Sequence, residues 1–190
     1  MMNLSALKID PEFQGKIPPL NAEEEHILEQ NMIQERRLLN PIIIWNGYIL
    51  DGHSRYRILK HHPEIAFEVK EIQLTDRYAA LAWICQNQLG RRNLDPERRK
   101  FLMGKAYENE KLSVGAPVGN QNKVNQCGQN VHIDLHKRTC ERIAERNGVN
   151  SKFVQRAEKY AKGVDAAEAA VPGACLLYTS PSPRDGATSR

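Results

Sequence analysis

A short stretch in the first half of the chain combines the residue types that bind phosphate. Asp51-Gly52 lies between an apolar run and an amphipathic segment that begins at once. A glycine at such a junction lets the backbone come close to a ligand, and the free N–H groups of the next helical turn attract anions. Arg55 and Arg57 add two guanidinium groups to that turn. The pattern predicts a phosphate-binding turn; the alternative is a glycine turn into a surface helix whose arginines are merely solvated.

The elements that must hold this turn are a hairpin before it and a helix after it. Two apolar runs, Pro41–Trp45 and Tyr48–Leu50, flank Asn46-Gly47, which is the strongest short hairpin signal. The helix after the turn is expected to run to about Lys60, because Pro63 cannot continue it.

The neighbouring segments predict an α+β unit over about 1–111. Residues 1–20 are expected to be extended, because three prolines interrupt regular structure there. The further elements expected are a helix over 22–36 capped by Asn21, a strand over 66–74, a helix from Thr75 or Asp76 to Leu89, and a helix from Pro96 to about Lys111. Helices and strands in this order are typical of the α+β class.

A change of composition marks the end of this unit. Ten of the 18 residues from Ser113 to Asn130 are Gly, Asn or Gln, and almost none can form a core. Such a composition predicts a linker. We therefore divide the chain into a first domain over 1–111, a linker over 112–136 and a second, all-α segment over 137–170.

The second segment has the spacing of a helix-turn-helix over 139–162. Ala144 supplies the small residue at the helix contact, Gly148 the turn, and Val154 the buried position of the second helix. From 137 to 162 there are eight Lys or Arg and three Glu. Six residues at the start and on the outer face of the second helix have the types that contact DNA: Asn150, Ser151, Lys152, Gln155, Arg156 and Lys159. The alternative is a structural helical hairpin with a solvated basic face.

With both halves in view, the chain resembles the ParB-like proteins, and most closely their divergent phage and mobile-element members. The stretch Gly52–Arg57, Gly-His-Ser-Arg-Tyr-Arg, resembles the family's Gly-Glu-Arg-Arg-x-Arg motif. The stretch Gln86–Glu97 resembles its Glu-Asn-x-x-Arg-x-x-Leu motif. The order of the two motifs and the helix-turn-helix after them also agree with the family. The resemblance covers about residues 4–165.

The resemblance implies a ParB/sulfiredoxin fold for the first domain and DNA binding by the helix-turn-helix. In partition proteins the first domain binds CTP with Mg²⁺, and nucleotide binding closes a dimeric clamp. CTP with Mg²⁺, duplex DNA and a homodimer are therefore the expected cofactor and partners. Candidate nucleotide- or phosphate-binding residues are Gly52, His53, Ser54, Arg55, Arg57, Asn87, Arg91 and Arg92.

Departures from the family motifs weaken the expectation of catalysis. His53 replaces the glutamate of the first motif, and an extra residue before Arg91 lets either Asn87 or Gln88 take the asparagine position. Mg²⁺ prefers carboxylate ligands, which are scarce around both motifs. The expected function is DNA binding in partition, maintenance or regulation of a mobile element. The alternatives are a nuclease or phosphoryl-transfer enzyme, which would have weak activity, and a nucleotide-free adaptor. The turn holds no cysteine, which argues against a sulfiredoxin.

The composition argues against a membrane span and against secretion. A membrane span requires roughly 20 apolar residues, and no run of that length is present. Four scattered cysteines and the lack of a secretory signal predict a cytoplasmic protein.

Two further features are set aside. One is a set of four residues with ligand types and spacing compatible with zinc: Cys127, His132, His136 and Cys140. No predicted element frames them, so no metal site is assigned. Residues 175–190 resemble translated sequencing-adaptor read-through and are left out of the fold; the natural C-terminal sequence would then be missing.

Overall fold

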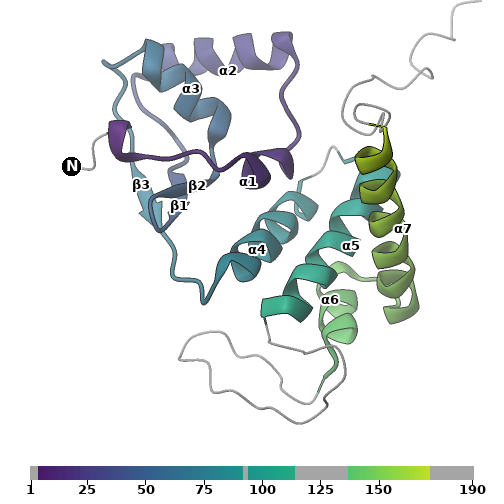
Figure 1. Ribbon diagram of the computed structural model, residues 1–190. Helices are drawn as coiled ribbons and strands as arrows, with labels where there is room; N and C mark the ends of the chain where they lie inside the picture. The colour runs from purple at the N-terminus through teal and green to yellow at the C-terminus, as the bar shows by residue number, and fades with distance from the viewer. Residues whose placement is uncertain (1–3, 92–93, 114–136, 172–190) are drawn as a thin grey trace, which may run out of the picture.

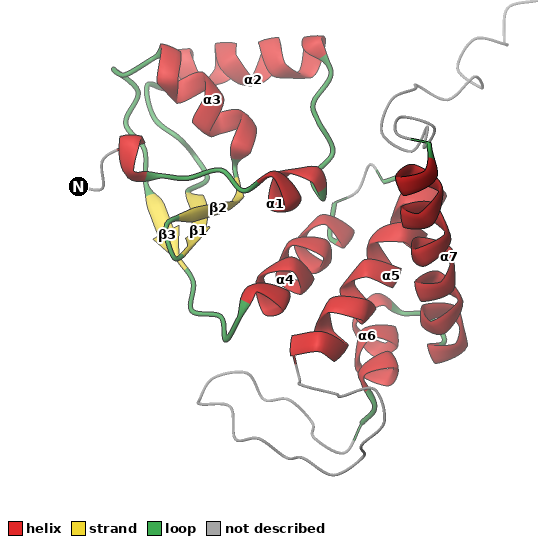
Figure 2. Ribbon diagram, in the orientation of Figure 1, coloured by secondary structure: helices red, strands yellow, loops and turns green. Residues whose placement is uncertain are grey.

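Residues 4–91, 94–113 and 137–171 are described by the computed structural model of the chain, and they form a mixed α+β fold (Figure 1). A three-stranded sheet with its helices makes up one side, and four helices make up the other (Figure 2). The elements in chain order are η1 (Leu4–Ala6), α1 (Pro11–Gly15), α2 (Ala22–Glu35), β1 (Ile42–Trp45), β2 (Tyr48–Asp51), α3 (His53–His61), β3 (Val69–Glu71), α4 (Arg77–Leu89), α5 (Pro96–Ser113), α6 (Thr139–Asn147) and α7 (Ser151–Ala170).

The sheet has the order β2-β1-β3. The expected hairpin is confirmed: β1 and β2 are antiparallel, and Asn46 and Gly47 both have positive φ, 49° and 79°. This is the backbone that an Asn-Gly turn favours. β3 pairs in parallel with β1 through Val69 to Glu71 only. The strand expected over 66–74 is therefore too long, because β1 offers only a four-residue edge to pair with.

The expectation that residues 1–20 are extended is wrong at α1. Pro11 occupies the first turn of this helix, where its missing N–H costs nothing. The Asp10 carboxylate accepts from the backbone N–H groups of Glu12 and Phe13 and so caps the helix. The buried ring of Phe13 then packs against Trp45 of β1 and Tyr48 of β2.

The other helices of the first half begin where their caps predict. Asn21 and Glu24 form a reciprocal capping box at the start of α2. Asp76, rather than Thr75, caps α4, since its carboxylate accepts from the N–H of Ala79 at 2.8 Å. α5 extends two residues beyond its expected end and includes Leu112 and Ser113, the first described residues of the expected linker.

The buried side chains fall into three clusters. One lies between the sheet, α2 and α3, and includes Ile42, Ile44 and Leu59. A second joins α1 and the sheet to α4 around Phe13. The third is wholly helical and combines α5 with the C-terminal end of α4, with α6 and with α7.

The contact between α5 and α7 depends on a glycine. A Cβ at Gly104 would lie 2.2 Å from the backbone oxygen of Ala157 and 2.8 Å from the Cβ of Ala161. Real Cβ atoms do not approach other atoms this closely, so only glycine permits this crossing. Ala157 and Ala161 are both fully buried there. α5 therefore belongs to the core of α6 and α7 as closely as to that of α4, and the domain boundary at 111 stays a prediction.

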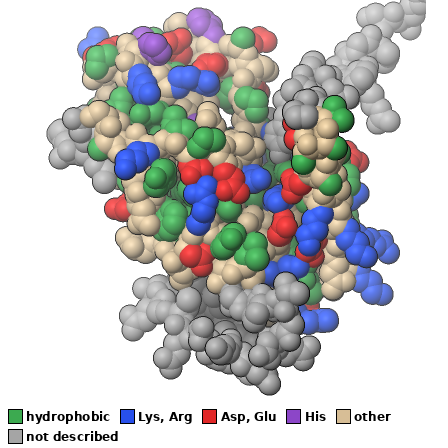
Figure 3. Space-filling model, viewed as in Figure 1, with side chains coloured by type: hydrophobic (Ala, Val, Ile, Leu, Met, Phe, Trp, Pro, Cys, Tyr) green, Lys and Arg blue, Asp and Glu red, His purple; other side chains and the backbone are tan. Residues whose placement is uncertain are grey.

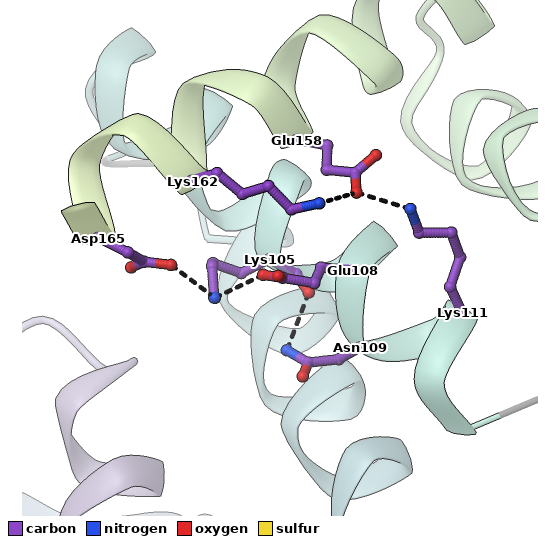
Figure 4. A network of polar contacts seen from close by, with 7 residues as sticks. All are labelled: Lys105, Glu108, Asn109, Lys111, Glu158, Lys162 and Asp165. Atoms are coloured by element: carbon purple, nitrogen blue, oxygen red, sulfur yellow. Dashed lines mark hydrogen bonds and ion pairs between the residues drawn. The ribbon is translucent and has the colours of Figure 1, made fainter. Parts of the chain in front are cut away.

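Ion pairs fasten the same two helices along their length (Figure 4). Lys105 of α5 donates to Glu108 on its own helix and to Asp165 of α7, at 2.6 and 2.8 Å. Lys111 of α5 donates to Glu158 of α7 at 2.6 Å, and Lys162 donates to the same carboxylate.

α6 and α7 meet at the expected turn. Gly148 has φ of 63° and ends α6 with a left-handed cap. Ala144, Ile143, Val154 and Ala157 are buried as the spacing predicts. No helix in the described ranges is both long and apolar enough to cross a membrane.

Candidate functional site

The N-terminus of α3 is open to a ligand because a glycine precedes it. Gly52 has φ of 102°, a left-handed conformation, and no side chain caps the helix. A Cβ at this position would lie 3.0 Å from Nη2 of Arg55 and 3.2 Å from its Nε. Gly52 thus allows the backbone turn and also leaves room for Arg55 to fold back over it.

The two sequence motifs meet at one carboxylate. Arg55 Nη2 donates to Asp51 Oδ2 at 2.7 Å, and Arg91 Nη2 donates to Asp51 Oδ1 at 3.0 Å. Asp51 is 15% exposed, so its charge is largely removed from solvent. Arg91 follows α4 and is 40 residues away along the chain. The first and second motifs are therefore brought together in space, with Asp51 between their arginines.

Three buried nitrogen atoms beside this carboxylate have no hydrogen-bond partner among the described residues. They are Nδ1 and Nε2 of His53 and Nε of Arg55. His53 as a whole residue is only 8% exposed. Burial lowers its pKa, and the charge of Asp51 partly opposes that effect. Buried polar atoms without partners are rare in proteins, and they often mark a place where a ligand, ion or water binds.

Two adjoining pockets lie over this helix end. The first, of about 410 Å³, is bounded by the α3 turn and Arg91 on one side and by α2 and the segment before it on the other. The second, of about 370 Å³, lies towards α1. His53 and Ser54 line both pockets. A ligand at the N-terminus of α3 would thus contact both residues from either pocket.

The remaining predicted residues of the two motifs are placed differently. Arg57 lines the second pocket and pairs with Glu25 of α2 at 2.9 Å, so it does not join Arg55 and Arg91. Asn87 is exposed on α4 and lines neither pocket. Gln88 is fully buried, and its amide has no partner among the described residues. Arg92 lies outside the described residues.

A metal ion has few ligands here. Both oxygens of Asp51 accept hydrogen bonds from arginine. In the ranges 4–91, 94–113 and 137–171, no group of three or more His, Cys, Asp or Glu is placed to hold a metal ion. Of the constellation considered for zinc, Cys140 is buried at the start of α6, and Cys127, His132 and His136 lie outside the described residues.

Some residues of the site were missed by sequence reasoning. Asp51 can be taken for a helix cap, although an acid four residues before Arg55 is a signal for an ion pair on one face. Glu24 and Asn31 of α2 reach the first pocket from a helix 20 or more residues earlier. Nothing in the local sequence indicates that contact.

A second candidate surface is the outer face of α7. Lys152, Gln155, Arg156 and Lys159 are all exposed, and at 100° per residue they lie opposite buried Val154 and Ala157. None of the three basic residues forms an ion pair within the part of the chain that the structure describes. Figure 3 shows Lys and Arg side chains gathered along the edge of the molecule where α7 lies.

The other two predicted DNA-binding residues are at the start of that helix. The Asn150 side chain accepts from the N–H of Lys152 at 2.8 Å and caps α7. Ser151 is the first residue of the helix and is partly exposed. Gln155 also approaches the sulfur of Cys140 on α6, with its Nε2 at 3.8 Å. The turn and the outer face are thus held by the same α6–α7 contact.

Comparison with solved structures finds a similar fold in a Pnob8-like ParB-N domain, with 23% sequence identity and a TM-score of 0.49. The similarity covers 58% of this chain and 44% of the solved chain. No protein-family model matches the chain, and no curated protein matches its sequence.

Proposed function

We propose that the chain is a ParB-like DNA-binding protein that binds a nucleotide or another phosphate at the N-terminus of α3 and duplex DNA through α6 and α7. Its role would be in partition, maintenance or regulation of a mobile element. The family part of the proposal rests on the two motifs, at 52–57 and 86–97. The observation that carries the phosphate site is the meeting of Arg55 and Arg91 beside an uncapped helix end.

The chemistry of this helix end suits a phosphate group. Two guanidinium groups converge on a carboxylate oxygen pair, which has a spacing similar to that of two phosphate oxygens. The helix N-terminus contributes free N–H groups and a partial positive charge. His53 and Arg55, whose side chains carry buried nitrogens with no partner among the described residues, both line the first pocket. The phosphates of CTP fit these residues.

The Mg²⁺ that accompanies CTP in partition proteins fits less well. Asp51 and Glu24 are the carboxylates that line the first pocket, and Asp51 is bound by two arginines. Mg²⁺ would have to displace those arginines to use it. The proposal therefore assigns phosphate contacts to Arg55 and Arg91 and assigns no step to a metal.

Nucleotide binding can be tested on the whole chain by thermal melting. CTP, the other nucleoside triphosphates and inorganic triphosphate are added in turn, and at least one is expected to raise the melting temperature, because a ligand that binds only the folded state stabilises it. Arg55→Ala should abolish the shift. Arg99→Ala, which removes an exposed arginine on α5, should retain it. If no phosphate compound changes the melting temperature, the phosphate site is refuted.

DNA binding can be tested without disturbing the fold. Deleting residues 137–165 would expose the buried face of α5, so substitution is the sharper tool. Replacing Lys152, Arg156 and Lys159 with Gln should weaken duplex binding and reduce the steepness of its salt dependence by up to about 0.9 for each DNA phosphate that is no longer neutralised. The matched control replaces Arg37, Lys70 and Arg99, three exposed basic residues elsewhere. Equally weakened binding in both triple variants would remove α7 from the DNA site.

The adaptor alternative has one observation in its favour. Arg55 and Arg91 already hold a carboxylate, that of Asp51, so the same arrangement can hold an acidic side chain of a partner protein. Binding of an acidic peptide with no effect of any nucleotide would favour this alternative.

The enzyme alternative would be favoured by metal-dependent nicking of plasmid DNA that Asp51→Ala abolishes. The homodimer is part of the main proposal and is tested by sedimentation equilibrium.

A further inference from the structure

His53 lines the first pocket but takes no part in the ion pairs that the described residues form around it. It is the first residue of α3, it lines both pockets, and only 8% of the residue is exposed. Neither ring nitrogen has a partner in the described part of the chain. A neutral imidazole has one N–H donor and one acceptor, and burying both without partners is unfavourable.

The charges around the imidazole come close to cancelling when the pocket is empty. On the side of the first pocket, Arg55 and Arg91 are matched by Asp51 and Glu24. On the side of the second pocket, Arg57 is matched by Glu25, and Lys60 lies over the ring of Tyr56. His53 therefore lies among charges of both signs. Burial lowers its pKa below the ordinary value of 6.5, and the charge of Asp51 partly opposes that effect. Without a bound anion, His53 is therefore expected to be mainly neutral at pH 7.

We infer that His53 takes up a proton from solvent when a phosphate-type dianion binds at the N-terminus of α3, and that its N–H then donates to the anion. This inference rests on the proposed phosphate site. The anion competes with Asp51 for Arg55 and Arg91 and adds two negative charges to a balanced pocket. The imidazolium offsets one of them. Both of its nitrogens are then donors, with the anion and the carboxylate of Asp51 as acceptors.

Thermodynamic linkage gives the direction in which the anion affinity changes with pH. If His53 binds a proton more tightly in the complex than in the free protein, the anion binds more tightly at lower pH. The affinity should rise by up to about tenfold per pH unit between the pKa of His53 in the complex and its pKa in the free protein. Outside that window it should be constant.

Sulfate is the probe, because it stays a dianion where phosphate itself titrates. Its binding to the whole chain is measured by calorimetry between about pH 5 and pH 8, the range in which histidine changes charge. The His53 imidazole signals are followed by NMR over the same range, with and without sulfate. We expect the midpoint of the His53 titration to move to higher pH with sulfate, and the sulfate affinity to fall as pH rises.

Two variants separate this inference from a general effect of pH. His53→Gln keeps a polar side chain that cannot titrate, and it should make the sulfate affinity independent of pH. His61→Gln removes an exposed histidine at the other end of α3 and should leave the pH dependence intact. The NMR titration needs no variant, so it stands even if His53→Gln does not fold.

The outcomes distinguish the inference from the function on which it rests. If sulfate binds, Arg55→Ala abolishes binding and the His53 midpoint does not move, then the phosphate site stands and the proton uptake is refuted. A pH dependence that persists in His53→Gln would also refute it. If sulfate and inorganic phosphate both fail to bind at any pH, the inference and the proposed phosphate site fall together.

Discussion

The carboxylate of Asp51 decides what the candidate site can bind. It accepts from Arg55 and Arg91 and is itself largely buried, so it occupies the place that an incoming anion would take. If the proposed phosphate site is correct, ligand binding is an exchange of one anion for another at the guanidinium groups of Arg55 and Arg91. The measured affinity for the incoming anion then depends on how much more strongly the arginines bind it than they bind Asp51. Competition from Asp51 lowers that affinity.

Removing that competitor should strengthen anion binding. Asp51→Asn leaves a similar shape but no charge, so Arg55 and Arg91 no longer have an internal anion and are free to bind phosphate. We expect inorganic phosphate to bind about tenfold more tightly, which corresponds to about 1.4 kcal/mol. The free energy of unfolding without phosphate should fall by about 1–3 kcal/mol, because the amide keeps only one acceptor oxygen and carries no charge, so one arginine loses its hydrogen bond and both lose their ion pair.

Calorimetry with phosphate and urea unfolding measure the two effects of Asp51→Asn. Glu12→Gln is the control, since it removes a carboxylate from an exposed ion pair with Arg77 away from the pockets. Unchanged or weaker phosphate binding in Asp51→Asn would show that Arg55 and Arg91 are not the phosphate ligands.

At the scale of elements, the α5–α7 contact leaves no room for a side chain at Gly104. A Cβ at Gly104 would meet the backbone of Ala157 at 2.2 Å, so a larger residue must push the helices apart. Gly104→Val should lower the free energy of unfolding by about 1–3 kcal/mol or more, the usual cost of overpacking. Urea denaturation measures it.

Gly163 provides a control position for the Gly104 substitution. It lies on α7, beyond the crossing, and a Cβ there would have nothing within 4 Å. Gly163→Ala should instead raise the free energy of unfolding by up to about 1 kcal/mol through helix propensity. If both glycine variants behaved alike, the close crossing of α5 and α7 would not be supported.

The contact between α2 and α3 should depend on pH. His62, at the end of α3, contacts Glu29 of α2 at 2.9 Å and Glu64 at 3.2 Å. The hydrogen bond with Glu29, followed by that with Glu64, raises the pKa of His62 above its ordinary value of 6.5. A raised pKa means that this contact stabilises the fold fully below pH 6.5, the value in the unfolded chain, and less as pH rises through the folded value.

Stability measured across that pH range should therefore differ between wild type and His62→Gln. In the wild type, the free energy of unfolding should decrease above pH 6.5 by an amount that the variant does not show. His61→Gln, which removes the exposed neighbouring histidine, should follow the wild type. Parallel pH profiles of wild type and His62→Gln would mean that this histidine does not contribute.

For the whole molecule, local sequence signals predicted the elements better than the contacts between them. Asn46-Gly47 and the caps Asn21 and Asp76 act within a few residues, and the structure confirms them. The same Asp-Pro signal that correctly starts α5 at Pro96 also starts α1 at Pro11, where the prolines alone suggested an extended chain.

The candidate site was predicted only in part, for physical reasons. Gly52 and Arg55 are close in sequence, so the turn and its arginine could be foreseen. Arg57 follows Arg55 at i, i+2 spacing, which places the two on different faces of the helix and should have separated their roles. The meeting of Arg91 with Asp51 and the burial of His53 depend on how α4 and α2 pack, and no local pattern encodes that.

The cluster that joins the sheet to α4 has an optical consequence. Both tryptophans of the chain belong to it: Trp45 on β1, whose indole N–H donates to the carbonyl of Leu74 at 3.1 Å, and Trp83 on α4. Tryptophan fluorescence therefore comes entirely from the seam between the sheet and α4. A change in emission on adding phosphate would therefore report a change at this seam, where α4 ends two residues before Arg91. α7 contains no tryptophan and does not contribute to the emission.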